Sequence, residues 1–134
     1  MLIQNEFAMR SSLIGAVAAL CTALSAVALA ADPAQEASTA ATHAGLAAQG
    51  AAVDQVHMHL HHAVNCLVGP KGRGFDANEA NPCQKLGDGA IPDTTDAAAK
   101  AKLTTALASA EAGLKSDDLA AARKAAAETQ AELK

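Results

Sequence analysis

Histidines are the residues of this chain best suited to chemistry, because four of the five fall within six positions, at His57, His59, His61 and His62. Imidazole is the commonest protein ligand for borderline transition metals, and it titrates near physiological pH. The rest of the chain is dominated by alanine. We therefore expect this histidine run, residues 57–62, to bind copper, nickel or zinc.

Residues 51–68 predict an α-helix, because they contain no proline and their valines and leucines recur at helical spacing. On a helix, His57 and His61 are four residues apart and project from one face. His59 and His62 are three residues apart and share a different face. The run therefore predicts two histidine pairs rather than one ring of four.

We predict that His57 and His61 form the primary metal site. Asp54 lies on the same side of the expected helix and adds a carboxylate to the two imidazoles, a donor set that suits zinc, copper or nickel. His57 falls at the edge of the apolar face, where neighbouring helices can fix its rotamer. The second pair is expected to form a weaker, more exposed site. Met58 adds a soft ligand for cuprous copper, although a lone helical methionine more often serves packing.

Other chemistries receive little support from the sequence. It contains no H-E-x-x-H motif, no C-x-x-C-H haem-attachment motif and no context for a serine triad. Its net charge of −4 and lack of a basic patch argue against a nucleic-acid partner. We expect metal buffering, delivery or sensing rather than catalysis. Two alternatives stay open: a module that binds a partner protein through a pH-sensitive histidine face, and a bundle that binds haem non-covalently through His57 or His61, which the scarcity of aromatic residues disfavours.

The N-terminal segment predicts export to the periplasm or secretion. Arg10 precedes a long apolar stretch that ends in Ala28-Leu29-Ala30, the layout of a cleavable signal peptide. Translation starts at Met1 or at Met9. We expect residues 1–30 to be removed, leaving residues 31–134 as a single domain with no membrane anchor.

Two cysteines, Cys66 and Cys83, remain after this cleavage, whereas Cys21 is lost with the leader. An even count in an oxidising compartment predicts a disulfide, which contributes roughly 3 kcal/mol in the chain-entropy description. The alternative is that both act as thiolates on a metal, since His62 lies four residues before Cys66.

The mature chain predicts an all-α fold: an up-and-down bundle of three or four helices with one long, disulfide-tied crossover loop at residues 69–92. Residues 33–68 form one long helix or two helices that meet near Gly50. His43 lies fourteen residues before His57, so two heptads bring it close to the same stripe. The loop is too rich in glycine and proline for regular structure, and further helices begin at residues 93–96 and 116–118, where capping residues occur.

These features resemble the small, histidine-rich periplasmic metal-binding proteins of bacteria, which are helical bundles. The resemblance covers the size, the alanine-rich composition and the run His57-Met58-His59-Leu60-His61-His62. It implies metal binding in the periplasm. This chain departs from those proteins in that its histidines are not repeated throughout, which argues against a high metal capacity.

Overall fold

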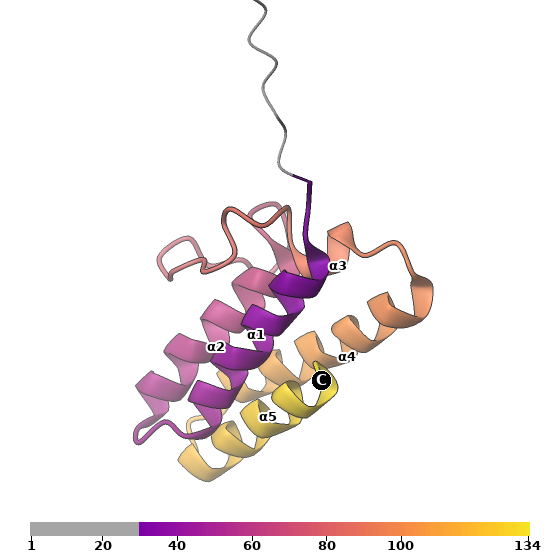
Figure 1. Cartoon of the computed structure of the whole chain (residues 1–134). Helices are drawn as coiled ribbons and strands as arrows, with labels where there is room; N and C mark the ends of the chain where they lie inside the picture. Colours follow the sequence, from indigo (N-terminus) through magenta and orange to yellow (C-terminus); the bar gives the residue numbers. More distant parts are fainter. Residues whose placement is uncertain (1–29) are drawn as a thin grey trace, which may run out of the picture.

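The computed structural model describes residues 30–134, and this part of the chain consists of helices and loops without a strand (Figure 1). The expected signal peptide therefore lies almost entirely outside the described residues. The predicted all-α class and helical bundle are confirmed. The helices are α1 (Pro33–Ala48), α2 (Val53–Val68), α3 (Ala90–Asp93), α4 (Ala97–Leu114) and α5 (Leu119–Glu132).

Aspartates begin three of the helices. The side chains of Asp32, Asp96 and Asp118 each accept a hydrogen bond from the backbone N–H three residues further on, at 2.9, 2.7 and 2.8 Å. Each bond satisfies a donor that has no partner within its own helix, and such a cap contributes about 1 kcal/mol. The predicted starts near residues 96 and 118 are confirmed.

The first segment is two helices rather than one, with Gly50 in the turn between them. α1 ends at Ala48 and α2 begins at Val53. A Cβ atom at Gly50 would come within 2.8 Å of the Val56 side chain, so the tight turn needs glycine. After this turn α2 runs back alongside α1 (Figure 1). One face of α1 therefore packs against α2, and its residues do not extend a row of α2 side chains as they would on one continuous helix.

The long helices pack in a closed arrangement around an apolar core. α1 contacts α2 and α5, and α4 contacts the same two helices from the other side. The largest fully buried apolar side chains all belong to α2, and the other helices contribute mainly alanines. The α2 residues are Val56, Leu60, Val64 and Leu67.

None of the helices in residues 30–134 is long and apolar enough to cross a membrane.

The crossover loop is fastened to the C-terminal half of α2. The predicted disulfide between Cys66 and Cys83 is present. The neighbouring Asn65 is fully buried, and its Nδ2 donates to the carbonyls of Asp76 and Ala80 at 2.9 and 3.1 Å. Its Oδ1 accepts from the backbone N–H of Asp76 at 2.9 Å. One buried amide therefore satisfies several backbone groups of a loop that lacks regular structure of its own.

The prediction that the whole loop lacks regular structure is wrong at its end, where α3 forms a single turn. This turn contains Pro92. Proline is tolerated in the first turn of a helix because the N–H that it lacks would have no partner there.

Candidate metal centre

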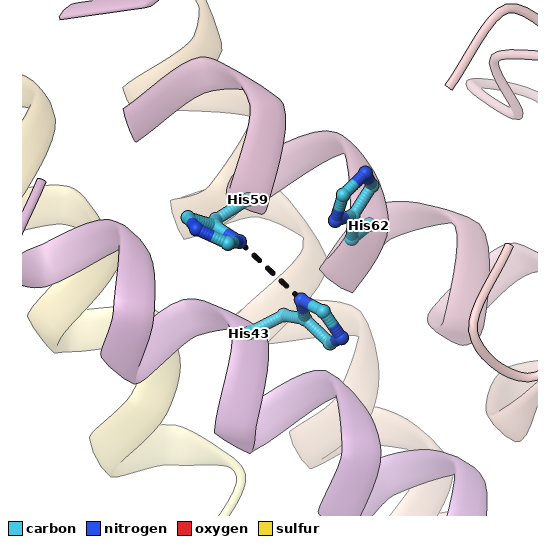
Figure 2. A group of neighbouring side chains, drawn as sticks. All are labelled: His43, His59 and His62. Atoms are coloured by element: carbon cyan, nitrogen blue, oxygen red, sulfur yellow. Dashed lines mark hydrogen bonds between the residues drawn. The ribbon is translucent and has the colours of Figure 1, made fainter. Parts of the chain in front are cut away.

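Three histidines from two helices converge on one point. His43 comes from α1, and His59 and His62 come from α2 (Figure 2). One ring nitrogen from each lies within 4.8 Å of the other two. The hairpin turn produces this arrangement, because it returns α2 along α1 and places His43 opposite the face that carries the other two rings.

The spacing of the rings suits a metal ion better than it suits a hydrogen bond. The Nδ1 atoms of His43 and His59 are 3.5 Å apart. An N–H···N contact of that length is at the outer limit of hydrogen bonding. Two imidazoles bound tetrahedrally to zinc at about 2.0–2.1 Å have their nitrogens about 3.3 Å apart. The two rings are therefore close to coordination spacing, and small rotations would complete it.

The protonation state of the site also favours binding. Burial lowers the pKa of His43 below its ordinary value of 6.5, and the neighbouring imidazoles of His62 and His59 lower it further. Burial is also the larger cause that lowers the pKa of His59, followed by the charge of His62. Both rings are therefore neutral at pH 7, and only a neutral imidazole can offer its lone pair to a metal.

His62 has one nitrogen without a protein partner. Its Nε2 lies 3.5 Å from Oε2 of Glu79, a residue of the crossover loop. Its Nδ1 is buried and has no hydrogen bond. A buried polar atom left unpaired is costly, by about 1–3 kcal/mol. A metal ion bound at Nδ1 would satisfy it.

The residues predicted to form the primary site are directed elsewhere. Nε2 of His57 donates to the carbonyl of Ser116 at 3.0 Å, in the turn between α4 and α5. Nδ1 of His61 lies 3.7 Å from Oδ2 of Asp76, and Asp54 is exposed. Within residues 30–134 these predicted ligands do not form a three-residue group with convergent donor atoms. Tertiary packing explains this difference. The α2 face with His57 and His61 meets the α4–α5 turn and the crossover loop, whereas the face with His59 and His62 meets α1.

The other residues considered as metal ligands are Met58, Cys66 and Cys83. Met58 is exposed, at 36 %. The alternative of two thiolates on a metal is wrong, because Cys66 and Cys83 are joined to each other. The candidate centre is therefore built from imidazoles.

His43 is a candidate ligand that the predicted set of site residues does not include. The sequence contains a signal that could have found it, since the glycine at position 50 indicates a hairpin. A turn centred near residue 51 pairs position 43 with position 59, because each lies eight residues from the centre. The two-heptad relation to His57 requires a continuous helix, and the structure has a turn in its place.

Comparisons with known proteins identify no family. The chain matches no protein-family model, and no curated protein or solved structure shows significant similarity to it. Its function must therefore be inferred from the chemistry of the candidate centre.

Proposed function

We propose that this protein is an exported helical protein that binds one transition-metal ion through His43, His59 and His62. The observation that carries the proposal is the convergence of one nitrogen from each ring within 4.8 Å. Two of these rings have a lowered pKa, with burial as its main cause, which supports binding at neutral pH.

The donor set favours copper, nickel or zinc, since imidazole suits all three metals. By the usual order of stability, Cu²⁺ should bind more tightly than Ni²⁺ or Zn²⁺. Three protein ligands leave at least one coordination position for water or for a ligand from another molecule. The three side chains are also only partly buried, so an ion can enter and leave. These properties suit buffering, delivery or sensing of the metal rather than catalysis.

Export is supported by two features that are independent of the histidines. The first is the signal-peptide layout of residues 1–30. The second is the disulfide between Cys66 and Cys83, since disulfides form and persist in the periplasm or outside the cell and are rare in the cytosol.

Calorimetric titration of tag-free protein, residues 31–134, with copper, nickel and zinc tests the proposal. Wild type should bind one ion per chain. His43→Ala should weaken binding more than about tenfold, which corresponds to about 1.4 kcal/mol. The matched control is the double variant His57→Ala/His61→Ala, which removes two histidines of α2 but leaves the candidate centre intact. It should bind nearly as tightly as wild type.

Three results would contradict the proposal in different ways. Unchanged binding by His43→Ala means that α1 supplies no ligand. Loss of binding only in the double variant means that His57 and His61 are the site. Wild type that binds no metal below about millimolar concentration has no metal function. Circular dichroism of each variant establishes that the helices are retained.

A further inference from the structure

Glu79 stands out among the loop residues because it contacts a ligand of the candidate centre. Its Oε2 is 3.5 Å from Nε2 of His62, and the two side chains are 32 % and 13 % exposed. The contact is therefore partly shielded from water. The nitrogen of His62 that it leaves free is Nδ1, which is buried and has no partner.

The chemistry of imidazole gives this contact a consequence. A neutral ring carries a proton on one nitrogen and a lone pair on the other. The 3.5 Å contact is an ion-pair distance rather than a hydrogen bond. A carboxylate so close to Nε2 favours, through its negative charge, the tautomer with the proton on Nε2, and the lone pair is then on Nδ1. Metal-binding histidines commonly donate their second nitrogen to a carboxylate, which fixes both the tautomer and the orientation of the ring.

The loop around Glu79 is held in place by two residues of α2, Asn65 and Cys66, which lie about one helical turn after His62. The Asn65 side chain donates to the carbonyls of residues 76 and 80, and its contact with the Glu79 carbonyl is 3.5 Å. The disulfide from Cys66 to Cys83 fastens the loop a few residues later. The loop that carries Glu79 is therefore attached to α2 about one turn after His62.

The neighbouring pair in the same loop provides an internal comparison. His61 Nδ1 lies 3.7 Å from Oδ2 of Asp76, so a loop carboxylate also faces this ring, but at Nδ1, which is buried without a hydrogen bond. His61 does not belong to the group of convergent histidines. If only the negative charge of the loop matters, removing either carboxylate should weaken metal binding. If Glu79 acts by positioning His62, only substitution of Glu79 should weaken it.

We propose that Glu79 is a positioning residue that fixes the tautomer and orientation of His62 and thereby strengthens metal binding at Nδ1. This inference rests on the proposed function, since it concerns the same site. The crossover loop then has a role in the metal site, although it supplies no ligand.

The test has one readout that needs no metal. Long-range ¹H–¹⁵N NMR spectra of the metal-free protein report which nitrogen of each histidine carries the proton. In wild type His62 should be mainly protonated on Nε2. Glu79→Ala should shift this ring toward a mixture of tautomers, and Glu79→Gln, which keeps an acceptor oxygen, should restore much of the wild-type signal. Asp76→Asn is the matched control and should leave His62 unchanged.

The second readout is calorimetric titration with Cu²⁺ and Zn²⁺. Glu79→Ala should weaken binding about 10-fold to 100-fold, the usual effect of removing such a partner, and Glu79→Gln should weaken it less. Asp76→Asn should bind within about twofold of wild type.

The two proposals fail in different ways. Wild type that binds no metal overturns the proposed function. Wild type that binds while Glu79→Ala binds equally well overturns the role of Glu79. That role is also overturned if Asp76→Asn weakens binding as much as Glu79→Gln, or if Glu79→Ala leaves the His62 tautomer unchanged.

Discussion

Glu36 should make the stability of this protein fall as the pH rises toward neutrality. Its side chain is fully buried on α1 beneath the crossover loop. Oε1 accepts from the backbone N–H of Gly89 at 3.0 Å, but Oε2 has no partner. Burial is the largest cause that raises the pKa of this carboxyl from 4.5 to about 7, assisted by the charges of Asp93, Asp32 and Asp88 and opposed by the Gly89 bond.

The sign of the effect follows from proton binding. Since the folded state binds this proton more tightly than the unfolded state, the contribution of Glu36 to stability is fully present below pH 4.5. It declines between pH 4.5 and about 7 and is lost above about 7. At about 1.4 kcal/mol per pKa unit, the contribution amounts to at most about 3.5 kcal/mol, of which about 3 kcal/mol is lost between pH 4.5 and pH 8. Glu36→Gln is the matched change, because the amide oxygen can still accept from Gly89 while the side chain stays neutral.

Urea unfolding of metal-free wild type and Glu36→Gln at pH 4.5 and pH 8 measures this contribution. The variant should match wild type at pH 4.5 and exceed its free energy of unfolding at pH 8, by up to about 3 kcal/mol. His43 and His59 have lowered pKa values, so their effect on stability has the opposite sign, rising with pH up to about 6.5. Subtracting wild type from the variant at each pH removes that effect. A difference between the two proteins that is the same at both pH values would refute the reasoning.

Two further predictions concern the metal and the leader. Burial holds the pKa values of His43 and His59 below 6.5, so protons should compete with the metal mainly below that pH. Calorimetric titrations at pH 7.5, 6.5 and 5 should therefore show a smaller loss of affinity over the first interval than over the second. A larger loss over the first interval would contradict this. Cleavage after Ala30 or Ala31 should give a mature chain that begins at Ala31 or Asp32. Mass spectrometry of the exported fraction measures the mass of this chain. An intact leader in the membrane would contradict export.

Features that depend on neighbouring residues in the chain could be predicted from the sequence. The caps at Asp96 and Asp118 are local, since each side chain bonds an N–H three residues away. The disulfide follows from the count of cysteines and their positions on either side of one loop. Buried positions such as Leu103 and Ala122 follow from helical periodicity.

The metal centre could be predicted only in part, because its completion depends on tertiary packing. Helical spacing indicates that His59 and His62 share a face, and it also indicates that His57 and His61 share another. It does not indicate which face meets a second helix that carries a histidine. The sequence ranks the pairs by their distance from the apolar face, and the structure places a third histidine, His43, beside the lower-ranked pair.

Glu36 and Glu79 could not be singled out for a related reason. Each is one of several acidic residues in an acidic chain, and nothing in the sequence around them indicates burial or a histidine partner. Glu36 is buried because the loop returns over α1, with the N–H of Gly89 donating to its carboxylate. Glu79 reaches His62 because Asn65 and the disulfide hold the loop against α2.

The alanine-rich composition has a direct bearing on the candidate centre. One side of α2 packs in the core through the largest apolar side chains, including Leu60 and Leu67, and this packing positions the helix that carries two of the candidate ligands. The third candidate ligand is on α1, whose fully buried apolar residues are alanines, at positions 40, 44 and 47. Short side chains let two helices approach closely, toward the lower end of the usual separation of about 8–10 Å. A close approach is what allows imidazoles from two helices to reach a single ion. We therefore expect that a larger side chain at Ala40, Ala44 or Ala47 disturbs the core and, where it widens the space between α1 and α2, separates the three histidines.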